Sequence, residues 1–235
     1  QMKSILLFLT LIYSLYGNVP FKIGEILHYD ASFGGISAAV GRLKVIGKEK
    51  VDNKMAYHVQ FTAISKGLTN YFFPINDKID LWLSEDSLNT IKVISSINEG
   101  NYSITRNIFL NHNNEFAIVN QDSIKITEGT HSPYSLFYYY RNKDLTKIKK
   151  QGINTIQGKK ITSLNIAIKN NIKVTVPAGE FLCSKVTPYK SNNSQFKNNA
   201  TMSIYFSNDE YKYPIMIWLK LKYGKLVLEL EKITN

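Results

Sequence analysis

The chain has 235 residues, of which 44% are hydrophobic, and a formal net charge of +11 at pH 7. This length and composition can bury one sizeable core, enough for one large β domain or two small ones. Cys183 is the only cysteine, which excludes an internal disulfide, so packing must supply the stability. The lysines are spread through the chain, which favours a solvated basic surface over a dedicated polyanion-binding site.

The first seventeen residues have the form of a secretory signal peptide. Lys3 is followed by an apolar run from Ile5 to Tyr16, which is too short to span a bilayer comfortably. A buried N-terminal helix and a short membrane anchor are the alternatives. No cysteine follows the run, so we expect no lipid attachment at a processed N-terminal cysteine. Export also argues against nucleic acid as a partner, and we expect no transmembrane span in the mature chain.

Short strands joined by turns account for the first half of the chain after residue 17. The first two strands, 26–33 and 36–46, flank Gly34-Gly35, and a polar loop at 48–54 follows them. In the next run, Tyr57, Val59, Phe61 and Ala63 alternate with polar residues, which is typical of a half-buried antiparallel strand. An aromatic connection at 66–74 leads to further strands at 77–83, 90–97, 102–110, 115–120 and 123–127.

One segment breaks the alternation. Ser132 precedes Pro133 and an aromatic run to Arg141, a pattern that predicts a helix capped by serine and continuing as far as Lys150. A strand is the competing interpretation, because Tyr and Phe favour sheets.

Alternation resumes in the second half. We predict strands at 154–157, 161–169, 171–176, 181–189, 201–206, 215–221 and 226–230, with a turn at Pro177-Ala178-Gly179. About fourteen short strands joined by tight turns predict an all-β fold with one short helix possible. Its architecture would be a large antiparallel meander, folded into a half-barrel or a sandwich. No repeat or composition shift marks a boundary, so we predict a single domain over residues 18–235.

Several short motifs occur in an order that resembles the exported bacterial family catalogued as domain of unknown function 3108. They are Gly24-Glu25-Ile26-Leu27-His28-Tyr29, Tyr57-His58-Val59, Asp77 with Leu81-Trp82, Glu99-Gly100-Asn101-Tyr102, Ser135 to Arg141, Val176 to Phe181, and Ile217-Trp218 with Gly224 and Leu230. The resemblance covers nearly everything after the signal. It implies a periplasmic or envelope protein whose meander is similar to that of small outer-membrane lipoproteins, and it brings no catalytic residues. We expect a structural role for Gly24, Glu25, Tyr29, Asp77, Glu99, Gly100, Pro177, Ala178, Gly179 and Gly224.

The sequence contains no recognisable catalytic or metal-binding motif. The four histidines, His28, His58, His112 and His131, are isolated, and neither a serine-hydrolase elbow nor a phosphate-binding glycine loop is present. We therefore predict no catalytic residue, metal or cofactor. Four acids, Glu25, Asp77, Asp80 and Glu99, are the candidates for a carboxylate pair, and the alternative is that Asp77 and Glu25 satisfy backbone groups at strand starts.

Large aromatic residues are the candidates for a ligand groove. Tyr71, Phe72, Phe73, Trp82 and Trp218 could line the concave face of a curved sheet for an acyl chain or glycan, or they could be core. We therefore expect an exported, non-enzymatic protein that binds a lipid-like ligand or an envelope partner protein. The alternatives are an envelope hydrolase with an unrecognised carboxylate site and a purely structural assembly factor. The oligomeric state is not predicted.

Overall fold

The computed structural model describes residues 19–148, 152–192, 201–221 and 224–235, and all structural statements concern these residues. The predicted signal peptide, residues 1–17, lies outside them, as do residues 193–200, which are most of the polar Ser/Asn loop that the sequence predicts at 190–200. Within the described ranges, no helix has the length and hydrophobicity needed to cross a membrane.

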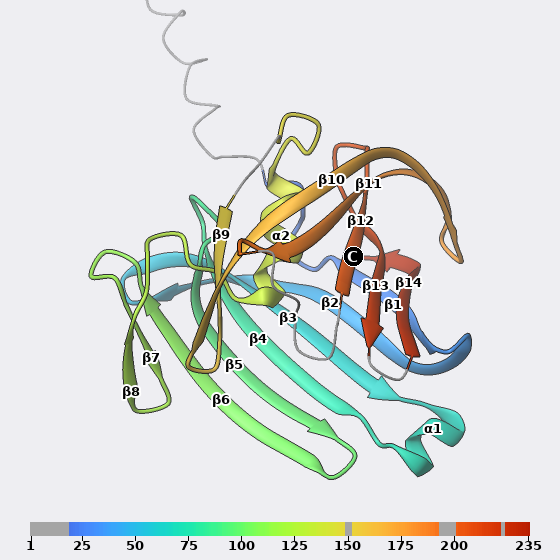
Figure 1. Ribbon diagram of the computed structural model, residues 1–235, viewed down its shortest axis with the longest axis horizontal. Helices are drawn as coiled ribbons and strands as arrows, with labels where there is room; N and C mark the ends of the chain where they lie inside the picture. Colours follow the sequence, from blue (N-terminus) through green and yellow to red (C-terminus); the bar gives the residue numbers. More distant parts are fainter. Residues whose placement is uncertain (1–18, 149–151, 193–200, 222–223) are drawn as a thin grey trace, which may run out of the picture.

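Fourteen strands form one antiparallel sheet, in the order β8-β7-β6-β5-β4-β3-β2-β1-β14-β13-β12-β11-β10-β9 (Figure 1). The first half of the chain runs outward from β1 to β8 and the second half runs inward from β9 to β14, so the pairing of β1 with β14 joins the two meanders. The strands are β1 (Ile26–Phe33), β2 (Ile36–Val51), β3 (Lys54–Ser65), β4 (Asn76–Ser84), β5 (Thr90–Glu99), β6 (Tyr102–Asn111), β7 (Phe116–Val119), β8 (Asp122–Lys125), β9 (Gly152–Gln157), β10 (Lys160–Val176), β11 (Gly179–Lys190), β12 (Thr201–Ser207), β13 (Pro214–Leu221) and β14 (Gly224–Thr234). The predicted all-β antiparallel meander is confirmed.

The sheet rolls so far that its two edge regions meet. His131, just beyond β8, forms a bridge with Thr155 of β9, and the Lys159 ammonium lies 2.6 Å from the Asp122 carboxylate of β8. All strands belong to this one sheet, so the fold is the half-barrel form of the prediction and not a sandwich of two sheets.

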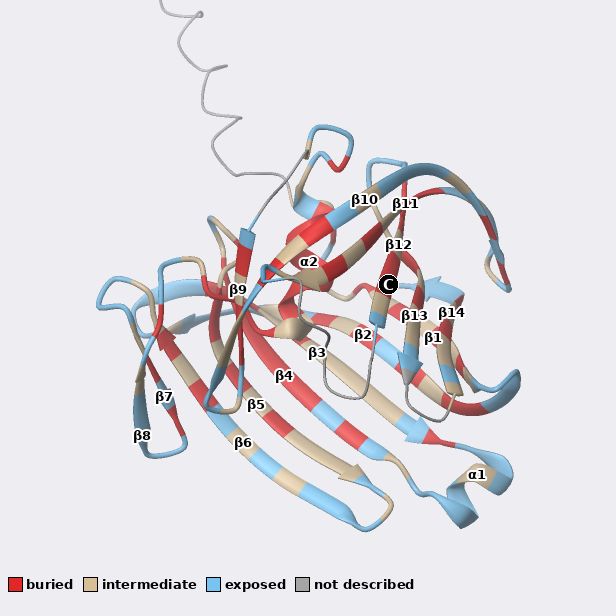
Figure 2. Ribbon diagram, in the orientation of Figure 1, coloured by how far each residue is buried: buried red, intermediate tan, exposed pale blue. Residues whose placement is uncertain are grey.

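The segment between β8 and β9 crosses the interior of the roll and fills it. We call its helical residues, 133–142, the plug. Three short helical turns follow one another there: η1 (Pro133–Ser135), α2 (Leu136–Tyr139) and η2 (Tyr140–Asn142). Ser132 caps the first turn by accepting a hydrogen bond from the Tyr134 amide, as the sequence predicts. All four α2 side chains are buried (Figure 2). The predicted continuation beyond Asn142 is not helical in the described residues.

Strand alternation places the core on the concave side. Val59, Leu81 and Val93 from neighbouring strands belong to the main hydrophobic cluster, together with the α2 side chains. A smaller cluster of Ala56, Trp82 and Ile91 lies on the opposite, convex face. The period of two along each strand therefore separates one large core from a small external one.

Three elements differ from the sequence prediction. The loop predicted at 48–54 is mostly strand, because β2 continues to Val51 and only Asp52 and Asn53 make the turn. The aromatic connection contains a short helix, α1 (Gly67–Phe72). The two strands predicted at 161–169 and 171–176 are one strand, β10, with an irregularity beside Asn171, which has a positive φ of 60°.

Candidate functional site

Glu25, a predicted structural residue, forms a fully buried ion pair. Arg141 at the end of the helical segment donates from Nη1 and Nη2 to its two carboxylate oxygens, at 2.5 and 3.0 Å. The guanidinium also donates to the backbone oxygens of Pro20 and Tyr211. All five donors of an arginine are difficult to satisfy in a core, and this constellation uses nearly all of them. The pair links the segment before β1, the interior plug and the β12–β13 connection to one another, and a structural role for Glu25 remains our prediction.

The other predicted structural residues lie at turns and packing points. The Tyr29 hydroxyl donates to the Pro214 oxygen at 2.7 Å, and the Ala178 amide donates to the Leu230 oxygen at 3.0 Å. The glycines make turns or allow close approaches: Gly24, Gly100 and Gly179 have positive φ, and a Cβ at Gly224 would lie 2.6 Å from the Phe33 ring. Pro177 precedes Ala178 in the β10–β11 turn.

The five aromatic candidates do not line one groove. Trp82 and Trp218 follow inward-facing neighbours, Leu81 and Ile217, so both point to the convex side of the sheet. Tyr71 and Phe72 are on α1 and are exposed to solvent. Phe73 lies against Gly100. The expectation of one aromatic groove on the concave face is therefore corrected, because strand alternation turns both tryptophans away from it.

The interior next to α2 is occupied by the chain itself. Tyr138 packs edge-on against Phe21 with ring centroids 5.1 Å apart, and Tyr140 lies 6.2 Å from Phe206. The hydroxyls of Tyr138 and Tyr140 are buried and have no hydrogen-bond partner among the described residues. This aromatic plug takes the space that an acyl chain would need in that part of the roll.

Two of the four candidate acids lie beside basic side chains. Glu25 is paired with Arg141, as described above. On the convex face, Asp80 accepts hydrogen bonds from Gln60 at 2.7 Å and from His58 at 2.9 Å, and it lies 3.2 Å from the Lys78 ammonium. Burial alone would raise the pKa of Asp80, but these contacts lower it. Asp80 is therefore an ionised structural acceptor.

The remaining two acids, Asp77 and Glu99, come together on the concave face. Asp77 is buried, accepts from the Asn98 amide at 2.8 Å and shares a side-chain hydrogen bond with Glu99. Burial raises the pKa of both carboxyls, and the charge of Asp77 raises that of Glu99 further. Tyr134 of the plug lies close to both acids. Burial, and then the charges of Asp77 and Glu99, raise the pKa of its hydroxyl to about 12. The sequence named this pair among its candidates but had no means to place it.

The histidines and the cysteine are placed separately. His58 stacks on Trp82 with ring centroids 4.5 Å apart, while Nε2 of His112 contacts the Thr90 oxygen at 2.7 Å. Burial lowers the pKa of His131 to about 4. In the described part of the chain, no group of three or more His, Cys, Asp or Glu side chains is placed to hold a metal. Cys183 is fully buried, and burial raises the pKa of its thiol to about 12.

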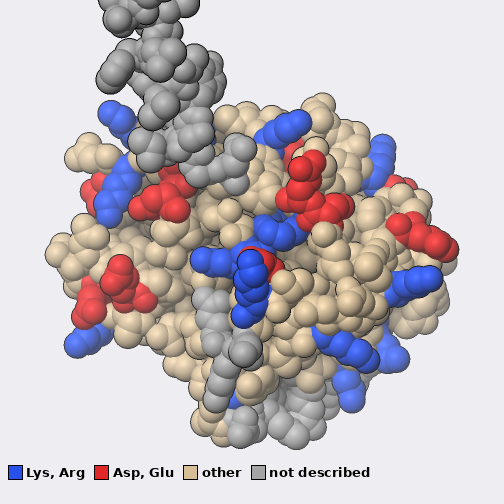
Figure 3. Space-filling view, turned by 90° about the horizontal axis from the view of Figure 1, so that it is seen from above, with Lys and Arg blue, Asp and Glu red and all other residues tan. Residues whose placement is uncertain are grey.

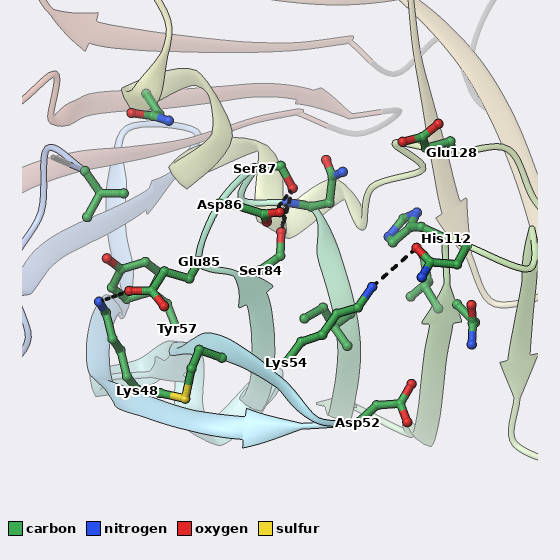
Figure 4. A pocket seen from close by; sticks show the side chains of 18 residues that line it. Lys48, Asp52, Lys54, Tyr57, Ser84, Glu85, Asp86, Ser87, His112 and Glu128 are labelled. Carbon is green, nitrogen blue, oxygen red and sulfur yellow. Dashed lines mark hydrogen bonds and ion pairs between the residues drawn. The ribbon is translucent and has the colours of Figure 1, made fainter. Parts of the chain in front are cut away.

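A pocket of about 900 Å³ opens at one end of the roll, opposite the end that carries α1 (Figure 4). Three connections that are distant in sequence form its walls: the β2–β3 turn, the β4–β5 connection and the β6–β7 turn. The apolar part of the lining consists of Val19, Met55, Tyr57, Ile91 and Leu110. The polar lining consists of Lys48, Asp52, Lys54, Ser84, Glu85, Asp86, Ser87, Asn89, Asn111, His112, Asn113, Glu128 and Asn142.

Many of the polar groups around this pocket are already held by one another. The Lys48 ammonium lies 2.5 Å from the Glu85 carboxylate, and this hydrogen bond raises the pKa of Lys48. The hydroxyls of Ser84 and Ser87 are 2.7 Å apart. Burial would raise the pKa of Asp86, but hydrogen bonds from both serines lower it. The lining is therefore largely pre-organised before any ligand arrives.

Two lining carboxylates are not held by cations. Within the residues described, neither Asp52 nor Glu128 forms an ion pair, and Lys54 is held only by a 3.4 Å contact with Asn113. These three side chains are exposed at the rim, where an incoming ligand would meet them. No sequence signal predicts this pocket, because its walls meet only in the folded roll.

The basic charge does not gather into one strip on the face drawn in Figure 3. Lys and Arg side chains are scattered there among groups of Asp and Glu. Such a mixed surface is typical of solvated charge and gives no track for a phosphate backbone.

The family model for "Protein of unknown function (DUF3108)" matches residues 28–231. The chain belongs to this family. The DUF3108 resemblance predicted from the ordered motifs is thus confirmed. No curated protein matches the chain.

Three solved structures of other proteins align with most of this DUF3108 chain. A β-barrel-like protein of domain of unknown function DUF1849 from Brucella abortus is similar over 90% of this chain and 97% of its own, with 10% identity and a TM-score of 0.58. A candidate lipoprotein from Parabacteroides distasonis aligns over 91% and 96% of the two chains, with 12% identity and a TM-score of 0.40. A candidate exported protein with a YmcC-like fold from Bacteroides fragilis aligns over 94% and 100%, with 12% identity and a TM-score of 0.37. Only the first score supports a shared fold, and it carries no function.

Proposed function

We propose that this chain is an exported protein of the cell envelope that acts by binding and not by catalysis. Export is supported by the basic start and apolar run within residues 1–17. Binding is supported chiefly by one observation, the pocket of about 900 Å³ at the end of the roll opposite α1. Its volume lies in the range of small-molecule sites, which is about 300–1,000 Å³.

The chemistry of the lining favours a hydrophilic ligand. Hydroxyls, side-chain amides and charges of both signs make up most of the lining (Figure 4), and three of its apolar side chains, Tyr57, Ile91 and Leu110, are buried. The class that suits such a lining is a glycan or another polyhydroxylated envelope component, because it can exchange many hydrogen bonds at once. The lipid-like ligand of the sequence hypothesis finds less support inside the roll, where the aromatic plug takes the space.

The hydrolase alternative keeps one supporting observation, the Asp77–Glu99 pair. Two carboxyls that share a hydrogen bond and have raised pKa values, beside the half-buried Tyr134, resemble the paired acids of some hydrolases. A strain lacking this protein, complemented with Asp77→Asn or Glu99→Gln, tests it. The binding proposal expects both variants to complement as well as the original chain. Failure of both variants, with normal melting temperatures, would favour the hydrolase.

Native mass spectrometry of the chain after mild extraction from the envelope tests the binding proposal. We expect an additional, non-protein mass on the original chain. Asn113→Trp should remove it by filling the pocket, while Asn114→Trp should retain it, because Asn114 is an exposed neighbour that does not line the pocket. A clean apo mass in several independent preparations of the original chain would contradict the proposal, as would an adduct retained in Asn113→Trp.

A further inference from the structure

Helix α1 exposes its apolar side chains to solvent. Leu68, Tyr71 and Phe72 are 80%, 84% and 77% exposed, and no residue of the helix is buried. Its N-cap residue, Lys66, makes no side-chain capping bond. A helix of six residues is far below the length that is stable alone in water, and most helical stability in proteins comes from burying an apolar face. This helix therefore presents its apolar face without a partner in the described chain.

The connections around α1 extend this apolar surface. The residues that flank the β1–β2 turn, Phe33 and Ile36, are 41% and 73% exposed, and Ile64, next to the last residue of β3, is 42% exposed. The backbone amide of Lys66 donates to the Ala38 oxygen, which ties the start of α1 to β2.

On its other side, α1 is followed by Phe73, which is 49% exposed and contacts Gly100 of the β5–β6 turn. Tyr102 in the same turn is 51% exposed. We call this set the α1 rim: Phe33, Ile36, Ile64, Leu68, Tyr71, Phe72, Phe73 and Tyr102. In Figure 2, α1 projects from the end of the roll and is coloured mainly as exposed.

Two of the lysines at this end are not paired with acids within the described residues. Lys220 and Lys225 face each other across the β13–β14 hairpin, both are exposed, and neither forms an ion pair within the described residues. Of the acids there, Asp30 lies 2.6 Å from the Lys66 ammonium, while Asp77 and Glu99 share a side-chain hydrogen bond and burial raises the pKa of both. An anionic surface would therefore meet uncompensated lysines.

We propose that the α1 rim is a membrane-docking surface that inserts its aromatic and aliphatic side chains into the head-group region of an anionic lipid bilayer. Aromatic side chains are enriched at membrane interfaces, where an apolar ring and a polar edge are both accommodated. Lysines beside them add attraction to anionic lipids. The apolar groups project from three separate connections, an arrangement that suits a deformable lipid layer better than the close-packed core of a protein interface.

The docking surface lies at the opposite end of the roll from the pocket. Successive turns of a meander alternate between its two ends, so the connection holding α1 and the β2–β3 turn lie at opposite ends of the roll. A chain resting on the bilayer by the α1 rim would hold its pocket away from the lipid. The inference does not depend on the pocket ligand, and either proposal can fail without the other.

Vesicle sedimentation tests the docking. The full chain is mixed with vesicles of phosphatidylcholine alone or with one third phosphatidylglycerol, so that any contribution of residues 1–18 is common to every variant. We expect binding to the anionic vesicles, weakened by high salt. The triple change Leu68→Ser, Tyr71→Ser and Phe72→Ser should weaken it about tenfold or more, which corresponds to a loss of about 1.4 kcal/mol or more.

A matched triple change removes exposed apolar side chains elsewhere. Ile23→Ser, Ile118→Ser and Leu182→Ser alter residues that are 57%, 39% and 47% exposed outside the α1 rim, and vesicle binding should be retained. Equal melting temperatures of the two triple variants establish that both are folded. Unchanged vesicle binding in the α1 triple variant would overturn the proposal. A second outcome would also overturn the proposal. If the original chain binds no vesicle but self-associates, and the α1 triple variant does not self-associate, the α1 rim binds protein and not lipid.

Discussion

Arg141 and Glu25, 116 positions apart, form a bidentate ion pair whose side chains are 1% and 4% exposed. The rings of Phe21, Tyr138 and Tyr213 surround the guanidinium at 5.1–5.8 Å. A charge in such surroundings is tolerated only when it is paired and hydrogen-bonded. The pair therefore fixes the position of the plug between the two meanders.

Breaking this pair should destabilise the chain severely. Glu25→Gln leaves the Arg141 charge buried without a carboxylate, and we expect a loss of about 3–5 kcal/mol in the free energy of unfolding. Urea denaturation measures it. Glu85→Gln is the matched control, because the Lys48–Glu85 pair has side chains 29% and 32% exposed and should cost less than about 1 kcal/mol. Equal losses in the two variants would refute a structural role for the buried pair.

Gly100 and Gly34 test the contact beside α1. Both have left-handed backbones, with φ of 57° and 59°, but a Cβ at Gly100 would lie 2.7 Å from the Phe73 ring while that at Gly34 meets nothing within 4 Å. Gly34→Ala should cost about 1–2 kcal/mol from backbone strain alone. Gly100→Ala should cost about 1–3 kcal/mol more from overpacking. Thermal unfolding measures these losses. In the double variant Gly100→Ala, Phe73→Ala the extra cost should disappear, and if it persists, Phe73 is not the obstacle.

The Asp77–Glu99 pair predicts that stability falls as pH rises. Both pKa values are raised in the folded chain above the ordinary 3.8 and 4.5, so the folded state binds more protons than the unfolded state between the ordinary and the raised values. The slope of the unfolding free energy with pH is negative in that window. Urea denaturation at several pH values should show Glu99→Gln gaining stability relative to the original chain as pH rises. Glu231→Gln, at an exposed position, controls for removing one carboxylate. A constant difference would contradict the raised pKa values of the pair.

The Cys183 thiol should be unreactive in the native chain. It is fully buried, and burial raises its pKa to about 12, so very little thiolate is present and none is accessible. A thiol reagent should label the native chain only through unfolding, and completely in denaturant. Asn113→Cys adds an exposed thiol that should react at once, as a control. Rapid labelling of native Cys183 would mean that the β11 region opens locally.

The sheet could be predicted because strand alternation is a local signal, as in the run from Tyr57 to Ala63. The end of β2 was hidden because its residues are mostly exposed there and therefore read as a polar loop. Helix α1 was missed because its aromatic residues favour strands and its burial pattern, with no buried residue, supplies no helical period.

The candidate site was only partly accessible from sequence. An arginine within the aromatic segment that ends at Arg141 signals that a carboxylate partner is needed, but several acids would satisfy that requirement equally. Asp77 and Glu99 were named, yet their meeting depends on the register of β4 and β5. The pocket walls come from turns around Asp52, Asp86 and Asn113, and only the curvature of the roll brings them together.

A fluorophore placed at each end of the roll tests most directly whether the chain docks on lipid by α1 and holds its pocket outward. An environment-sensitive dye is attached to Phe72→Cys in one variant and to Asn113→Cys in another, with Cys183 protected by burial. On anionic vesicles, the dye at position 72 should shift to shorter wavelength and become shielded from an aqueous quencher, while the dye at position 113 should change in neither respect. Shielding at position 113, or none at position 72, would contradict the account.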